Sequence, residues 1–122
     1  MRKFALALMA ALALIPALVF AHGNTKPQHG GIVQMSGETV FELVVKPASV
    51  ELYVTEDDEP VAPSDATASL VVTKGGKETR VSLAAGPNNG FVAKAAVPKG
   101  ASVGVVVKYK SGTKTFTTYT LK

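Results

Sequence analysis

The chain has 122 residues, no cysteine and a formal net charge of +4. We expect one domain from this length, and the absence of cysteine excludes disulfides, thiolate metal sites and lipoprotein attachment. The basic excess is small and dispersed, whereas a nucleic-acid-binding surface needs a concentrated basic stripe, so we expect no nucleic acid partner.

Residues 1–21 have the three parts of a secretory signal: the basic pair Arg2 and Lys3, an apolar run, and a compact ending at Ala21. We expect cleavage after Ala21, which would leave 101 residues with 11 basic and 9 acidic side chains. The alternative is a retained membrane anchor. Pro16 and an apolar run shorter than the roughly 20 residues of a span argue against it. The sequence therefore predicts a periplasmic protein with no stable membrane anchor after cleavage.

From residue 32 onward, apolar and polar residues alternate with the period of two that is typical of strands with one buried face. The expected strands are 32–35, 39–45, 49–55, 67–73, 78–84, 91–97, 102–108 and 113–121. Their spacing predicts an all-β, single-domain antiparallel β-sandwich over residues 32–122. We expect it to be immunoglobulin-like or cupredoxin-like, with about 7 or 8 strands.

The segments between the strands carry turn signals. Gly75 and Gly76 predict a tight hairpin, because glycine readily adopts positive φ angles. Residues 56–65 are acidic and contain Pro60 and Pro63, which predict an irregular loop that crosses between two sheets. Within the strands, we expect Glu42 to lie on an outward face, and the hydroxyl groups of the three tyrosines, at positions 53, 109 and 119, to be solvated.

Residues 22–31 form a segment that we expect to be flexible, and it contains both histidines of the chain, His22 and His29. Cleavage after Ala21 would give His22 a free α-amine beside its own imidazole. If His29 folded back, three nitrogens would converge, which suits Cu(II) in a tetragonal field and also Zn(II). The alternative is that both histidines are simply solvated in a terminal tail.

The acidic run at residues 56–59 includes Asp57 and Asp58, which we predict as additional metal ligands if this loop lies beside the histidine segment. The alternative is a solvated loop that keeps the domain soluble. Met35 would offer a soft thioether to copper(I), although a methionine at the end of a strand more often fills a gap in the core.

Motifs for catalysis are absent from the sequence. It has no Gly-x-Ser-x-Gly turn, no phosphate-binding P-loop and no dinucleotide glycine fingerprint. A serine nucleophile would also have to use one of only two histidines as its base. We therefore expect a protein that is not an enzyme.

Four short motifs stand out: Ala-His-Gly at the end of the leader, residues 21–23, Lys-Pro-Gln-His-Gly-Gly-Ile-Val at 26–33, Phe-Glu-Leu-Val at 41–44 and Leu-Tyr-Val at 52–54. Together they resemble motifs of small periplasmic proteins and accessory domains associated with bacterial heavy-metal resistance and efflux. The resemblance implies a β-sandwich that handles copper, zinc or a related cation, with His22 and His29 as the matching positions. It also implies an efflux protein or another envelope protein as partner. No histidine follows His29, so the full ligand set of the periplasmic copper-resistance carriers is not present.

Two hypotheses follow. The first is a periplasmic metal-binding carrier or buffer module that uses His22, His29, Asp57 and Asp58. The alternative is a non-catalytic envelope module that binds another protein through its strand edges or loops and holds no metal.

Overall fold

A computed structural model describes residues 26–122, which contain nine strands and one short 3₁₀ turn. The predicted leader and His22 lie outside these residues. The strands are β1 (Ile32–Ser36), β2 (Thr39–Val45), β3 (Val50–Glu56), β4 (Glu59–Pro60), β5 (Ala66–Lys74), β6 (Lys77–Ala85), β7 (Phe91–Ala93), β8 (Ser102–Tyr109) and β9 (Lys114–Thr120), and the 3₁₀ turn is Pro87–Asn89. Nothing helical in residues 26–122 has the length and apolar character needed to cross a membrane.

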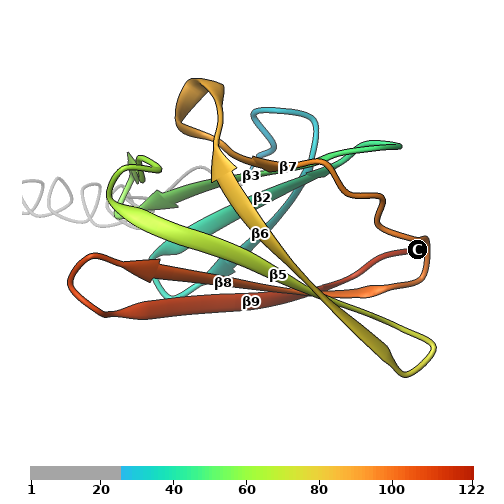
Figure 1. Ribbon diagram of the computed structural model, residues 1–122. Coiled ribbons are helices and arrows are strands. Elements are labelled where there is room, and N and C mark those ends of the chain that lie inside the picture. Colours follow the sequence, from blue (N-terminus) through green and yellow to red (C-terminus); the bar gives the residue numbers. More distant parts are fainter. Residues whose placement is uncertain (1–25) are drawn as a thin grey trace, which may run out of the picture.

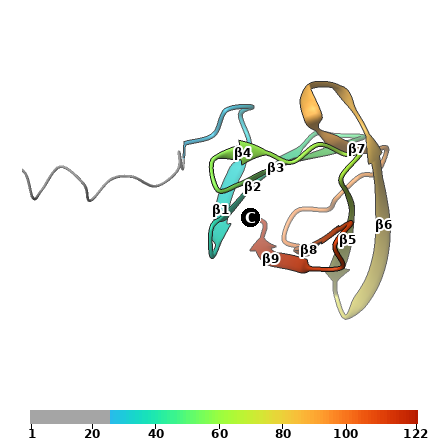
Figure 2. The same cartoon turned by 90° about the vertical axis from the view of Figure 1, so that its left-hand side faces the viewer.

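All strand pairs are antiparallel, which confirms the predicted all-β class. The order across the sheet is β1-β2-β3-β7-β6-β5-β8-β9, with the short β4 paired to β3. Two layers face each other (Figures 1 and 2), but they are joined where Ala84 and Ala85 of β6 pair with Val92 and Phe91 of β7. The strands therefore form one continuous, nearly closed sheet rather than two separate sheets.

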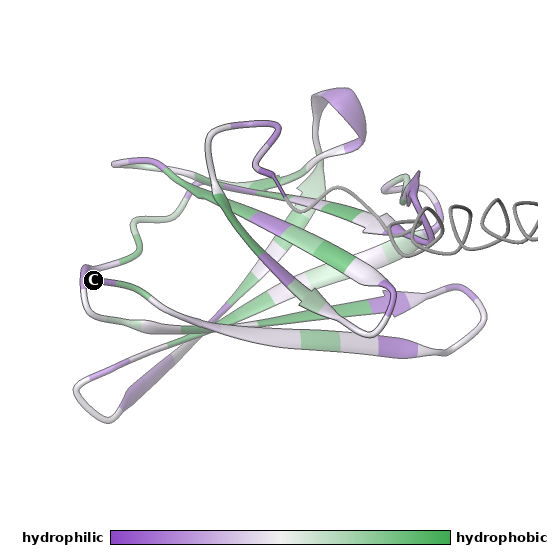
Figure 3. Cartoon of the chain, turned by 180° about the vertical axis from the view of Figure 1, so that it is seen from behind, coloured by the Kyte–Doolittle hydropathy of each residue, from purple (hydrophilic) through white to green (hydrophobic). Residues whose placement is uncertain are grey.

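The core follows from the alternation along the strands. Val103, Val105 and Val107 of β8 are completely buried, as the period of two predicts. Hydrophobic positions alternate with hydrophilic ones along the strands and the turns are mainly hydrophilic (Figure 3). The largest buried side chains outside β8 are Phe41, Leu43, Val50, Leu52, Leu70, Phe91 and Tyr119. Strands from both layers thus contribute to a single core.

The predicted strand boundaries agree with the structure within one or two residues, except for β7. This strand was expected to continue to residue 97 but ends at Ala93. Beyond that point the chain is irregular, and it turns at Pro98–Ala101, where the N–H of Ala101 donates to the carbonyl of Pro98. Ala95 and Val97 remain half-buried against the core. Their apolar spacing thus reflects packing without strand pairing.

The acidic segment after β3 was expected to be an irregular loop, and its first part is instead a tight hairpin. Glu59 and Pro60 of β4 pair with Glu56 and Thr55 of β3. Asp57 and Asp58 form the turn, with φ angles of 53° and 67°. Aspartate tolerates this left-handed region because its short side chain can hydrogen-bond locally. The Gly75-Gly76 hairpin between β5 and β6 is confirmed, with φ angles of 59° and 79°.

Two tyrosine hydroxyl groups that were expected to be solvated are buried. Tyr119 of β9 is 1 % exposed, and its hydroxyl donates to the carbonyl of Phe41 in β2 at 3.0 Å. The hydroxyl oxygen of Tyr109 is also buried. Burial, followed by the nearby Glu56 carboxylate, raises the pKa of Tyr109 to about 12. The prediction failed because the curled sheet brings both hydroxyl groups against β2 or β3: the Tyr119 hydroxyl lies at Phe41, and the Tyr109 hydroxyl lies beside Glu56.

The two ends of the sheet, β1 and β9, meet without a backbone ladder between them. A side-chain hydrogen bond joins them instead, because the hydroxyl of Thr117 donates to the side-chain oxygen of Gln34 at 2.7 Å. On one side of this contact, β1 pairs with β2, the strand that contains Glu42 of the candidate site described next.

Candidate functional site

Glu42, in the middle of β2, lies at the centre of the site. Its neighbours Phe41 and Leu43 point into the core, so strand alternation turns Glu42 to the opposite face. We predicted that this face is open to solvent, and that prediction is wrong. Glu42 is only 5 % exposed because residues 28–31 pass over it.

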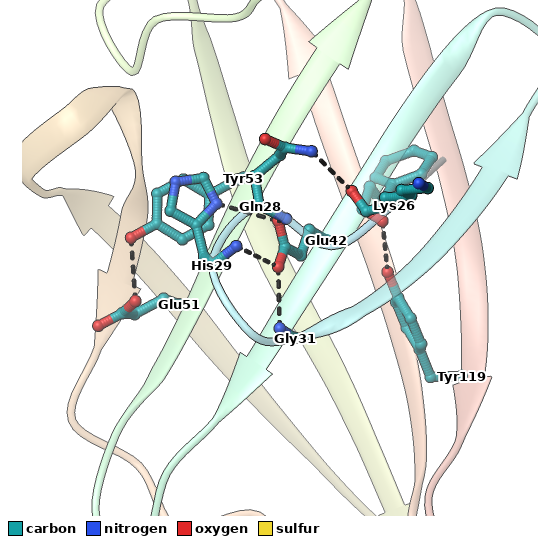
Figure 4. Close-up of polar contacts among 9 residues, drawn as sticks. Lys26, Gln28, His29, Gly31, Glu42, Glu51, Tyr53 and Tyr119 are labelled. Atoms are coloured by element: carbon teal, nitrogen blue, oxygen red, sulfur yellow. Dashed lines mark hydrogen bonds and ion pairs between the residues drawn. The ribbon is translucent and has the colours of Figure 1, made fainter. Parts of the chain in front are cut away.

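The Glu42 carboxylate accepts four hydrogen bonds from this segment (Figure 4). Its Oε1 atom accepts from the backbone N–H of Gln28 and faces Nδ1 of His29, both at 3.0 Å. Its Oε2 atom accepts from the backbone N–H groups of His29 and Gly31, both at 2.8 Å. His29 is therefore held in place by its backbone and its ring together.

The segment can approach β2 this closely because residue 31 is glycine. A Cβ atom at Gly31 would overlap the carbonyl oxygen of Leu43 and lie 2.8 Å from Cγ2 of Val44. Gly30, just before it, has a φ of +78°, the left-handed region that favours glycine. These two glycines fold the chain around the carboxylate.

Two opposing effects act on the pKa of Glu42. Burial raises it, since the charged form loses solvation. The hydrogen bonds from the His29 ring and from the backbone N–H groups of Gly31, His29 and Gln28 lower it, and together they prevail. The pKa of Glu42 therefore lies below its ordinary value, and the side chain is a carboxylate at neutral pH.

The ring of His29 also has a second partner. It stacks on the ring of Tyr53 in β3, with centroids 3.5 Å apart and planes 3° from parallel. The Tyr53 hydroxyl donates to Oε1 of Glu51 at 2.9 Å, and Nζ of Lys46 donates to Oε2 of the same carboxylate at 2.9 Å. The Lys46 hydrogen bond contributes most to lowering the pKa of Glu51, while burial and then Glu51 raise the pKa of Tyr53.

A small cavity of about 140 Å³ lies at these residues, and it brings together two of the predicted ligands, His29 and Asp58. Asp57, the other turn residue, does not line it, and its backbone N–H donates to the carbonyl of Glu38 instead. Met35 is 44 % exposed on β1 and also lies outside the lining. The full lining is Lys26, Gln28, His29, Val33, Val40, Glu42, Tyr53, Thr55 and Asp58.

The chemistry of this arrangement follows from the two nitrogens of the His29 ring. Nδ1 is engaged by Glu42, whereas Nε2 makes no hydrogen bond with any residue in the range 26–122. A carboxylate on one imidazole nitrogen is the arrangement that orients histidine ligands in metal sites, leaving the other nitrogen to bind. Residues 26–122 hold no group of three His, Cys, Asp or Glu side chains that would complete a metal site by themselves.

Glu42 and Tyr53 are the site residues that sequence reasoning missed. A signal for Glu42 was present, since Val40 and Val44 flank it on its own face of the strand. An acidic residue between two valines on a supposedly solvated face indicates that something covers that face. The stacking of Tyr53 on His29 depends on contacts between distant segments, which no local pattern reports.

Comparison with known proteins identifies no family. No family model matches the chain, and no curated protein matches it. Among solved structures, the chain is similar to one described as the crystal structure of a bromine derivative of BhCBM56. The sequence identity is 15 %, the match covers 75 % of this chain and 99 % of the other, and the TM-score is 0.45. This likeness is too distant to carry an argument about function.

Proposed function

We propose that the protein is a non-catalytic periplasmic module that carries or buffers a divalent cation, Cu(II) or Zn(II). The ligands are Nε2 of His29, the carboxylate of Asp58, and the α-amine and imidazole of His22 after cleavage of the leader. The observation that supports this most directly is the hydrogen bond between Nδ1 of His29 and Glu42, 3.0 Å long. It presents the second ring nitrogen of His29 as a ligand.

The described residues supply two of these donors, so the proposal needs the other two from His22. Six residues lie between His22 and His29, and the seven residue-to-residue steps span at most roughly 25 Å. The amine and imidazole of a terminal histidine form a chelate, which adds two nitrogens at one position. Asp57 is left out of the ligand set because it does not line the cavity with His29.

A calorimetric titration of Cu(II) into the protein purified after export tests the proposal. We expect one saturable site, weakened at least about tenfold by an alanine inserted before His22, because the insertion separates the amine from the ring. His29→Gln should also weaken binding. Asp57→Asn and Asp58→Asn are a matched pair at adjacent turn positions, and only Asp58→Asn should lower the affinity.

The outcomes separate the ligands. Unchanged affinity after the insertion would remove the α-amine from the site, and unchanged affinity in His29→Gln would overturn the proposal as a whole.

The finer fold prediction, an immunoglobulin-like or cupredoxin-like domain behind a cleaved leader, stays part of this proposal. So does the efflux or other envelope protein as the partner that receives the ion.

A second candidate is the envelope interaction module without a metal, and one observation favours it. Phe116 of β9 is 65 % exposed, and its partner across the ladder is Val106 of β8. An aromatic ring on an open sheet face is typical of protein interfaces. A partner captured from envelope extract despite a chelator, lost with Phe116→Gln and kept with Thr118→Gln, would support this function over the first.

A further inference from the structure

A second and larger cavity, of about 340 Å³, lies between the β5–β6 hairpin and the irregular segment that follows β7. It exists because β7 pairs with β6 only at Ala84 and Ala85. The rest of β6 has β5 on one side and no strand on the other among the described residues. In Figure 1 the β5–β6 hairpin extends away from the opposite layer.

The inward face of β6 becomes more exposed toward the hairpin. Leu83 and Val81 are half-buried, whereas Thr79 and Lys77 are exposed. The side chains that line the cavity are mainly apolar, and they come from two strands and the irregular segment. They are Val72, Lys74, Lys77, Thr79, Val81, Ala95, Ala96, Val97 and Pro98. The cavity therefore has an apolar wall on both sides.

Two ammonium groups provide the charge of the lining, which includes no acidic residue. Nζ of Lys74 donates to the carbonyl of Lys99 at 2.6 Å. This carbonyl belongs to the turn at Pro98–Ala101, where Gly100 has a φ of +82°, so the Lys74 ammonium is held over that turn. The ammonium group of Lys77 has no hydrogen-bond or ion-pair partner within residues 26–122, although its backbone pairs with Lys74 in the β5–β6 ladder.

We propose that this cavity binds a small amphipathic organic anion, with an apolar body against Val72, Val81 and Val97 and a carboxylate between Lys74 and Lys77. The volume lies at the lower end of the range for small-molecule sites, about 300–1,000 Å³. An apolar lining with a few fixed polar groups is the usual composition of such sites. Lys74 keeps two donors for the ligand, because its bond to Lys99 uses only one of three.

The charge pattern selects among ligands. A neutral apolar molecule would give neither ammonium group an anionic partner, and a small inorganic anion would leave the apolar wall in contact with water. A medium-chain carboxylate satisfies both parts. The site is separate from His29 and Asp58, and neither residue lines it. The inference therefore does not depend on the proposed metal function.

A titration of the whole exported protein with octanoate, followed by two-dimensional amide NMR, tests the inference. We expect saturable shifts centred on Val72, Val81 and Val97. Octan-1-ol has the same chain length without the charge, and its affinity should be lower by a factor of about ten or more. Lys74→Gln and Lys77→Gln should each lower the affinity about threefold or more, since each removes one partly solvated charge contact.

Matched variants separate this site from general charge or surface effects. Thr79→Phe places a ring inside the cavity and should abolish octanoate binding, whereas Ser82→Phe lies on the outer face of the same strand and should not. Lys114→Gln removes an exposed lysine from β9 and should leave the affinity unchanged. Equal binding of octanoate and octan-1-ol, or full affinity in Thr79→Phe, would overturn the inference.

Discussion

The imidazole of His29 lies flat on the phenol ring of Tyr53, with centroids 3.5 Å apart and planes 3° from parallel. The Tyr53 ring also packs closely against Gly90, where an added Cβ atom would lie 2.7 Å from Cε2 of the ring. Gly90 therefore contacts the same ring on which His29 stacks.

The first prediction concerns this stack. Tyr53→Leu should lower the free energy of unfolding by about 1 kcal/mol and weaken Cu(II) binding, because His29 loses the ring beneath it. Tyr53→Phe keeps the ring and should retain most of both properties. Urea unfolding and copper titration of the two variants provide the measurements. Equal loss in both variants would mean that the hydroxyl bond to Glu51, rather than the stack, is what matters.

Replacement of Glu42 is the second prediction. Glu42→Gln should lower the free energy of unfolding by about 2–3 kcal/mol. The amide NH₂ group of glutamine is a donor, so it cannot accept the hydrogen bonds that residues 28–31 donate to the carboxylate. The control is Glu51→Gln, whose side chain is more exposed and accepts two bonds from other side chains. It should cost less than about 1 kcal/mol. Chemical denaturation at pH 7 compares the two, and similar costs would contradict the central position given to Glu42.

The third prediction is how the stability difference between wild type and Glu42→Gln depends on pH. The pKa of Glu42 lies below its ordinary value of 4.5, so the carboxylate stabilises the fold fully above about pH 4.5. This contribution is lost as the pH falls through the lower, folded-state pKa. The gap in unfolding free energy between wild type and Glu42→Gln should thus be constant near neutral pH and narrow in acid. A gap that widens in acid would reverse the sign assigned here.

Gly31 gives the fourth prediction. Gly31→Ala should cost about 2–3 kcal/mol and detach the segment at residues 28–31, since the new methyl group overlaps the carbonyl of Leu43. Gly104→Ala is the control, because its Cβ would meet only Val71 at 3.8 Å. It should change stability by less than about 1 kcal/mol. Thermal unfolding and hydrogen exchange at the His29 amide report both effects, and rapid exchange in wild type would argue against the Glu42 contact itself.

The fifth prediction concerns Tyr119. Tyr119→Phe should lower the free energy of unfolding by about 1–2 kcal/mol, because the buried carbonyl of Phe41 loses its donor. Tyr53→Phe removes a hydroxyl from a half-exposed ring and provides the comparison.

Burial raises the pKa of Tyr119 strongly, so its hydroxyl should stay protonated at a pH where free tyrosine ionises. Ultraviolet titration of wild type and Tyr119→Phe would show whether this ring ionises early instead.

Local patterns predicted most of the strands because each depends on its own alternation. Val103, Val105 and Val107 are an example, since burial of one face follows from the period alone. The same reasoning could not predict the β6–β7 pairing that joins the two layers, because Ala84 and Ala85 carry no sign of their partners. It also misjudged Pro60, which is tolerated in the short edge strand β4.

The candidate site was predicted only in part, because residue types can be read from the sequence whereas contacts between distant segments cannot. His29 and Asp58 were selected by residue type, and the structure places both at one cavity. Glu42 was dismissed because strand alternation alone cannot reveal that another segment covers its face. His22 lies outside the described residues, and its role stays a prediction.

The meeting of β1 with β9 has a consequence for how the chain assembles. Gln34 and Thr117 are 83 positions apart, so their contact forms only after nearly the whole polypeptide is available. In a chain that emerges amino end first, β1 can pair with β2 but lacks its contact with β9 until the last hairpin has emerged. Deletion of that hairpin should therefore leave a species prone to self-association, and formation of the β1–β9 contact should be slow compared with formation of the local hairpins.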